Sequence, residues 1–240
     1  MNLNIVQDFI PVGRRNRPGR VNPMLFVTIH ETGNTNRGAN ARAHGKYLRG
    51  NDAANLPVSW HYTVDDSVTV QHLPENEDTF HAGDGAGSGN RQSIGIEMAV
   101  NSDGNFQTTI DRTAALVADI CIRRNIPIAN IRQHFHWIGK NCLQNIRAGR
   151  PITWAVFLEK VQAAMDAKTA PPVAPPTTPT TPALVETVNF DLFGKAVEID
   201  GMIIGGRTFV AARHLLESMG GYSVGWNGST NTVIVRRVAN

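Results

Sequence analysis

The sequence predicts an α/β protein with a central mixed β-sheet flanked by helices, followed by a small α+β module. Strand-like and helix-like segments alternate along the chain up to residue 168, and this alternation favours a sheet with helices packed on it. A stretch rich in proline and threonine, 169–183, then interrupts both patterns. The remaining segment, 184–240, has strand and helix patterns of its own, which indicates a second module.

Strands of the first domain, residues 1–168, are predicted where β-branched and aromatic residues run together or alternate with polar ones. They are 25–30, 59–64, 67–73 and 93–100. Helices are predicted where apolar residues recur every three or four positions. They are 39–49, 109–124 and 153–167. Thr108 or Thr109 is the expected N-cap of the second helix.

The stretch 169–183 holds six of the chain's 13 prolines and no charged residue. Because proline fixes φ and lacks an N–H donor, we expect an extended, semi-rigid spacer that could separate two modules by about 45 Å. In the module after it, short strands are predicted near 185–190, 195–199, 222–226 and 232–236. An amphipathic helix is predicted at 208–219, closed by a pair of glycines.

Composition narrows the class of protein. The chain is 41% hydrophobic and 18% charged, which is enough apolar material for a packed core. It has no apolar run near the roughly 18 residues of a membrane helix, and its first residues lack the basic and apolar parts of a secretory signal. We therefore expect a cytoplasmic protein without membrane insertion.

The net charge is +3, and four arginines cluster at 14–20. Proline and glycine break this cluster, and no aromatic residue is interleaved with it. We therefore interpret it as a solvated loop, or as a contact with an anionic surface polymer, rather than as a nucleic-acid site. The two cysteines are not expected to form a disulfide, because Cys121 lies on the apolar stripe of the helix at 109–124 and is interpreted as a core thiol.

The chain carries a combination of side chains that Zn²⁺ favours. His30 ends the first predicted strand, and His134, His136 and Cys142 follow much later in the chain. Two imidazoles and one thiolate would leave the fourth tetrahedral position open, as in a catalytic rather than a structural zinc site. His134 and His136 compete for the second histidine position, and their spacing does not decide between them.

Two further residues fit metal-assisted hydrolysis. Glu97 lies in the predicted strand 93–100 and is a candidate base for a water molecule. Lys140 lies two places before Cys142 and is a candidate cation for the negative charge that develops during hydrolysis.

A glycine-rich stretch, 81–90, interrupts the strands. It is too irregular for a phosphate-binding loop, and we interpret it as a flexible wall of a substrate groove. His81 opens this stretch and is therefore a candidate substrate-binding residue, together with Trp60 and His136.

Five motifs, in order along the chain, resemble those of the zinc-dependent N-acetylmuramoyl-L-alanine amidases of the amidase type 2 family. They are Val-Thr-Ile-His30, Ser-Trp-His-Tyr-Thr-Val-Asp65, Phe-His81-Ala-Gly-Asp-Gly, Ser-Ile-Gly-Ile-Glu97 and the segment from His134 to Cys142. The resemblance covers roughly residues 3–167 and implies a fold shared with peptidoglycan recognition proteins.

The resemblance also implies roles for individual residues. The zinc ligands would be His30, His134 and Cys142, because the family's histidine lies eight places before the cysteine. Glu97 matches the catalytic carboxylate and Lys140 the active-site lysine. The implied reaction is hydrolysis of the amide between N-acetylmuramic acid and L-alanine by zinc-activated water.

Three positions depart from the pattern of the family. Leu143 replaces the usual proline after the zinc cysteine, and Glu31 follows His30 where the family often has Asn or His. His136 stands where many relatives have Asp. None of these departures removes a ligand.

The segment 184–240 resembles a copper amine oxidase N-terminal-like module, which occurs on cell-wall proteins without copper chemistry and implies a wall-binding or spacer role. Together the resemblances imply a monomeric phage endolysin that uses Zn²⁺, is made in the cytoplasm and acts on peptidoglycan after release. The alternatives are a host autolysin and a non-catalytic peptidoglycan receptor. Such receptors typically lack the zinc cysteine, and this chain has Cys142.

Overall fold

The computed structural model describes residues 3–169 and, beyond them, the backbone of the strands at 186–192, 195–204, 207–210, 222–227 and 232–237. The chain divides into two compact units, Met1–Pro171 and Pro172–Asn240. The division falls inside the proline-rich stretch 169–183. None of the described helices is long and apolar enough to cross a membrane.

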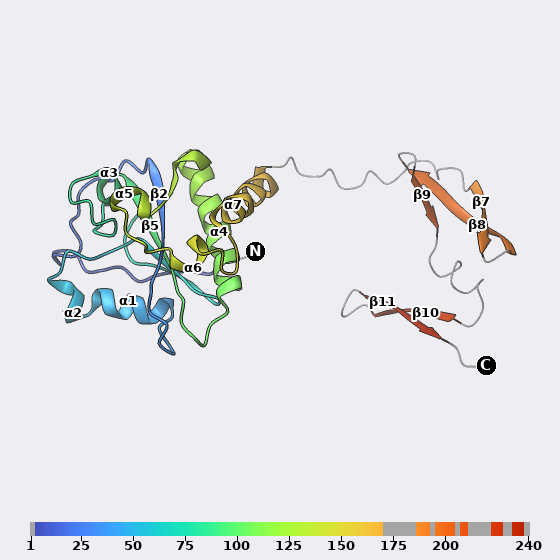
Figure 1. The fold of residues 1–240 in the computed structure, drawn as a ribbon, viewed down its shortest axis with the longest axis horizontal. Helices are drawn as coiled ribbons and strands as arrows, with labels where there is room; N and C mark the ends of the chain where they lie inside the picture. Colours follow the sequence, from blue (N-terminus) through green and yellow to red (C-terminus); the bar gives the residue numbers. More distant parts are fainter. Residues whose placement is uncertain are drawn as a thin grey trace. The chain divides into compact units, whose positions relative to one another are not determined.

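The first unit is built on a six-stranded sheet with the strand order β1-β4-β3-β5-β2-β6. Its β2 and β5 are labelled in Figure 1. The strands are β1 (Ile5–Gln7), β2 (Phe26–Glu31), β3 (Tyr62–Val64), β4 (Thr69–Gln71), β5 (Ser93–Met98) and β6 (Ile131–Gln133). β3 and β4 run antiparallel, and every other neighbouring pair is parallel. The sheet is therefore mixed, as predicted. β1 and β6 were not predicted.

Helices flank this sheet. They are α1 (Ala41–Arg49), α2 (Asn51–Ala54), α3 (Ser88–Arg91), α4 (Phe106–Arg124), α5 (Phe135–Ile138), α6 (Gln144–Arg147) and α7 (Trp154–Thr169), with a 3-10 turn at Ile128–Asn130. The prediction of the α4 N-cap was wrong: Asn105 caps the helix, and its side chain accepts a hydrogen bond from the backbone N–H of Thr108 at 3.0 Å. Asparagine is among the residues that cap helices best, and here it begins the helix at Phe106, before the apolar stripe of α4.

The main core lies on one face of the sheet. Val27 and Ile29 of β2 are fully buried there and belong to the same apolar cluster as residues of α4 and α7, which pack against each other (Figure 1). Cys121 is part of this cluster at 1% exposure, and burial raises the pKa of its thiol to about 12. The interpretation of Cys121 as a core thiol is therefore confirmed, and Cys121 and Cys142 are both free cysteines.

The opposite face of the sheet carries polar residues. Side chains alternate along a strand, so Thr28 and His30 point away from the core that holds Val27 and Ile29. α1 packs against β3 and β4, and a small apolar cluster of Ala41, Val68 and Val70 lies beneath it. The face opposite the core is thus divided between α1 and the carboxyl ends of β2 and β5.

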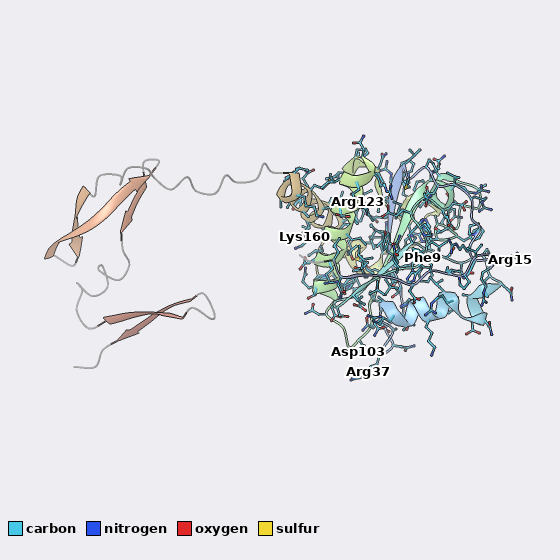
Figure 2. All side chains as sticks on the ribbon, turned by 180° about the vertical axis from the view of Figure 1, so that it is seen from behind. Phe9, Arg15, Arg37, Asp103, Arg123 and Lys160 are labelled. Atoms are coloured by element: carbon cyan, nitrogen blue, oxygen red, sulfur yellow. The ribbon has the colours of Figure 1, made fainter. Side chains whose placement is uncertain are left out.

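The arginine cluster at 14–20 is partly neutralised within the first unit. Arg17 forms an ion pair with Glu77 at 2.7 Å, and Arg20 forms one with Asp78 at 2.8 Å. Arg15 is exposed and projects from the surface (Figure 2). Two of the four cationic groups therefore already have carboxylate partners, which agrees with a loop rather than a basic docking surface.

The second unit contains two small antiparallel sheets. β7 (Glu186–Leu192), β8 (Lys195–Ile204) and β9 (Arg207–Val210) form one, and β10 (Tyr222–Asn227) pairs with β11 (Thr232–Arg237) in the other. The helix predicted at 208–219 is wrong at its start, because residues 208–210 belong to β9. The rest of that prediction, and the spacer after Thr169, lie outside the described residues.

Candidate metal centre

Three side chains from separate parts of the chain meet at the carboxyl ends of β2 and β6. His30 is near the end of β2, His134 directly follows β6, and Cys142 lies in the loop between α5 and α6. β2 and β6 are parallel neighbours, so their carboxyl ends lie at the same edge of the sheet. One ring nitrogen of each histidine and the Cys142 sulfur lie within 4.8 Å of one another. The predicted ligand set is thus brought together.

Both histidines offer a bare ring nitrogen to this space. His30 Nδ1 lies 3.6 Å from Cys142 Sγ. His134 donates from Nε2 to the carbonyl of Ala82 at 2.9 Å, and its buried Nδ1 has no hydrogen-bond partner within the described part of the chain. Burial lowers the pKa of His30 and of His134, so both rings are neutral at neutral pH, which is the form that binds a metal. Two neutral imidazoles and a sulfur fit a zinc ion.

The thiol of Cys142 stays protonated unless a cation coordinates its sulfur. Burial and the neighbouring Glu97 carboxyl raise the pKa of its thiol to about 12. The thiol donates to the backbone carbonyl of Glu31 at 3.5 Å. A thiol releases its proton to solvent or a base when its sulfur coordinates a metal ion, so the high pKa of the free thiol does not oppose its role as a ligand.

Glu97 lies beside the three donor atoms. It is opposite His30 in the register of β5 and β2, and its Oε1 lies 3.9 Å from His30 Nδ1. Its Oε2 is buried and, among the described residues, has no hydrogen-bond partner. Burial raises the pKa of Glu97 to about 8, and the positive charge of Lys140 opposes this shift. A carboxyl group that titrates near neutral pH can both accept and return a proton.

Lys140 supplies positive charge to the same site from the exposed loop after α5. Its ammonium group is close enough to lower the pKa of His30, His134 and Glu97. A positive charge in this place favours negative charge at the centre, and the part of Lys140 in hydrolysis stays a prediction.

Glu31 fastens the loop that carries Cys142 to the end of β2. Its carboxylate is 4% exposed and accepts hydrogen bonds from the backbone N–H groups of Asn145, at 3.0 Å, and Ile146, at 3.1 Å. The Asn145 side chain donates to the same carboxylate at 2.9 Å. Leu143, in place of the family's proline, is fully buried in the main core. Both departures from the family pattern thus hold the Cys142 loop against the sheet.

Replacement of Glu31 tests this role. We expect Glu31→Ala to lower the free energy of unfolding of the metal-free protein by about 2–3 kcal/mol, because two buried N–H groups lose their acceptor. Glu31→Gln retains one acceptor oxygen and should lose less. Denaturant titration measures both. Glu159→Ala, on the exposed surface of α7, is the control and should change stability little; an equal effect of Glu31→Ala and Glu159→Ala would contradict the fastening role.

The environment of His81 differs from the one expected. The residue is 8% exposed, and its Nδ1 lies 2.9 Å from His30 Nε2. Burial, with the neighbouring His61 and His134, lowers the pKa of His81 well below 6.5, so its ring is neutral. The ring is enclosed behind His30 rather than presented to a substrate.

The glycine-rich stretch 81–90 is also more ordered than a flexible wall. The Asn90 side chain accepts the backbone N–H groups of His81 and Ala82, and the Asp84 carboxylate accepts those of Gly89 and Asn90. Part of the stretch lines a pocket of about 400 Å³ together with Arg20, Pro57 and Phe80. It is thus one wall of a pocket, held by its own hydrogen bonds.

The other two predicted substrate-binding residues, Trp60 and His136, differ in their surroundings. Trp60 is 7% exposed, donates from Nε1 to Thr63 Oγ1 at 2.7 Å, and lines a groove of about 370 Å³ with Thr32, His44 and Tyr47. Thr63 is opposite Glu97 in the sheet register, so Trp60 is bonded to a neighbour of Glu97 in the sheet. His136 is exposed on α5 with its ring against Trp137, and it is not one of the three residues whose donor atoms meet.

Comparison with known proteins agrees with this geometry. The sequence model of the N-acetylmuramoyl-L-alanine amidase (Amidase_2) family matches residues 20–146, a range that includes His30, Glu97, His134 and Cys142. The chain belongs to this amidase family. Within the amidase family, XlyA of Bacillus subtilis (strain 168) is 49% identical over 140 residues, which cover 58% of this chain and 46% of XlyA. CwlH of the same organism is 44% identical over 141 residues, covering 58% of this chain and 55% of CwlH.

A solved structure of the XlyA catalytic domain matches with a TM-score of 0.62 and 46% identity, covering 66% of this chain and 99% of that domain. A mutant endolysin from Bacillus subtilis matches with a TM-score of 0.63 and 43% identity, covering 67% of this chain and 99% of the other. The predicted fold is therefore confirmed as that of amidase catalytic domains. The chain spans about half the length of the curated amidases that it matches.

Proposed function

We propose that this chain is a zinc-dependent N-acetylmuramoyl-L-alanine amidase that hydrolyses the amide between the lactyl group of N-acetylmuramic acid and L-alanine in peptidoglycan. The observation that carries the proposal is the meeting of three donor atoms within 4.8 Å, beside a buried carboxylate oxygen of Glu97 that has no hydrogen-bond partner among the described residues. Family membership adds support, because XlyA and CwlH bear the name of this activity.

A zinc ion held by His30, His134 and Cys142 would act as a Lewis acid and would lower the pKa of a water molecule. Glu97 accepts a proton from the attacking water, because its carboxylate lies beside His30 and has a free oxygen. Lys140 stabilises the negative charge on the tetrahedral carbon's oxygen. Glu97 then delivers the proton to the leaving nitrogen. The C–N bond breaks, and the products are a lactyl carboxylic acid and a free amino terminus on L-alanine.

The proposal has a direct test. Purified full-length chain is incubated with purified peptidoglycan, and new amino termini are counted with and without a chelator. We expect release of L-alanine amino termini that stops with the chelator and returns when zinc is added back. A chain that binds the peptidoglycan but releases no amino termini, with or without added zinc, would instead be a receptor.

We further propose that the protein acts as a phage endolysin, with the first unit as the catalytic domain and residues 184–240 as a wall-binding module after the spacer 169–183. The similarity to an endolysin from Bacillus subtilis supports the first part. Sedimentation of the full chain with intact walls, compared with a chain that ends at residue 171, tests the second. Equal sedimentation of the two would assign wall binding to the first unit alone.

A further inference from the structure

The two histidines among the candidate metal ligands each need a specific proton arrangement. A neutral imidazole carries one N–H and one bare nitrogen, and only the bare nitrogen can bind a metal. Which nitrogen is bare is set by the hydrogen bond at the other nitrogen. At this centre Nδ1 of His30 lies 3.6 Å from Cys142 Sγ, and Nδ1 is the nitrogen of His134 without a hydrogen-bond partner among the described residues, so metal binding requires both rings to carry their protons on Nε2.

For His134 the backbone decides. Its Nε2 lies 2.9 Å from the carbonyl oxygen of Ala82. A carbonyl has no hydrogen to donate, so the proton is on Nε2 and Nδ1 is bare.

For His30 the position of the ring proton is set by two side chains, Ser93 and His81. The hydroxyl of Ser93 donates its only hydrogen to the carbonyl of Gly89 at 2.6 Å. At its other contacts Ser93 Oγ must therefore accept, and one of them is His81 Nε2 at 3.2 Å. The proton of the neutral His81 ring is thus on Nε2, which leaves His81 Nδ1 bare. His30 Nε2, 2.9 Å from that nitrogen, must then donate to it, and His30 Nδ1 remains free for the metal.

The neighbours of His81 hold its ring in this place. Gly95 of β5 lies directly beneath it, and a Cβ atom at that position would come within 2.7 Å of His81 Cγ. Thr28 also contacts Ser93 Oγ, at 2.8 Å, and receives the indole N–H of Trp137 at 3.0 Å. Because the hydroxyl hydrogen of Ser93 is taken by Gly89, Thr28 donates to Ser93 as well, and the acceptor role of Ser93 is complete.

We propose that the dipeptide His81–Ala82 fixes the proton positions of both ligand histidines, with His81 as the positioning residue for His30 and the Ala82 carbonyl as the acceptor for His134. The Asn90 side chain holds this dipeptide by accepting both of its backbone N–H groups, at 2.8 and 2.7 Å. The inference rests on the proposed zinc site, and it gives the sequence Phe-His-Ala-Gly a role in metal binding rather than in substrate contact.

The first test is zinc affinity, measured by competition between the full-length protein and a chromophoric chelator. We expect His81→Phe to weaken zinc binding by about 10- to 100-fold, as loss of a hydrogen-bonding partner behind a metal ligand does. His81→Asn, which places an acceptor oxygen near the position of Nδ1, should restore part of the affinity. His72→Phe is the matched control: His72 is also buried, with its Nε2 2.8 Å from Thr63 Oγ1, and its loss should change zinc affinity by less than about twofold.

The second test is the ¹⁵N NMR spectrum of the imidazoles in the metal-free wild-type protein, which needs no variant to fold. We expect His30, His81 and His134 each to be protonated on Nε2. A proton on Nδ1 of His30, or zinc affinity in folded His81→Phe equal to that of the wild type, would overturn the inference. If the wild type itself bound no zinc, the proposed function would fail instead, so the two failures are distinguishable.

Discussion

Glu97→Gln is expected to lower the rate of amino-terminus release from peptidoglycan by about 10²- to 10⁴-fold, the range that a general acid–base group contributes. Glutamine has the same size as glutamate but cannot take up the proton of the attacking water. The Glu97 carboxyl is unusually suited to that task, because burial raises its pKa to about 8 and so keeps its two protonation states close in free energy near neutral pH.

The same variant should retain its zinc, since Glu97 Oε1 is 3.9 Å from His30 Nδ1 and is not among the three donor atoms that meet. Elemental analysis of the purified protein measures the zinc, and Glu159→Gln on the exposed face of α7 is the control for activity. Release of amino termini by Glu97→Gln at the wild-type rate would remove Glu97 from the reaction.

Cys142→Ala is expected to weaken zinc binding by about 10²- to 10³-fold, which is roughly one ligand's share of the free energy of a structural zinc site. The sulfur lies 3.6 Å from His30 Nδ1, and within the described residues no other side chain joins the two histidines in a metal-binding group. Activity should fall with the metal content and return only in part when zinc is supplied in excess.

Cys121→Ala is the matched control for this experiment. Cys121 is also a free thiol, but it is buried in the core between the sheet and α4, on the other face from His30. Its replacement should reduce stability slightly and leave the zinc content unchanged. Equal zinc content in the two cysteine variants would contradict the assignment of Cys142 as a ligand.

Much of the site could be predicted from the sequence because its ligands lie at the ends of regular elements. His30 ends an apolar strand, and the pattern of β2 predicts both its burial and the face that it shares with Thr28. The choice between His134 and His136 could not be made from spacing. The chain changes from strand to helix between Gln133 and Phe135, so residues two apart there do not share a face.

The parts that could not be predicted depend on contacts between distant segments. Glu31 differs from the family pattern, and nothing local to it indicates that its carboxylate caps a turn at Asn145. His81 lies in a glycine-rich segment that resembles an exposed loop. Asn90 accepts a hydrogen bond from its backbone N–H, and its ring is held behind His30. The α4 N-cap was misplaced for a different reason, because the apolar stripe indicates where the helix packs and not where its first turn begins.

Side chains alternate between the two faces of β2, so the metal centre forms only when this strand is correctly paired. Val27 and Ile29 fill the core beneath α4, while Thr28 and His30, one step away along the same backbone, lie on the opposite face, where His30 reaches the metal centre. If β2 paired one residue out of register, the imidazole of His30 would enter the apolar core and Ile29 would face the polar side of the sheet. The core and the metal centre would then be lost together. Under the proposed activity, a chain that is mispaired or incompletely folded therefore has no metal centre and cannot hydrolyse peptidoglycan. Only correctly folded molecules can damage the wall of the cell that synthesises them.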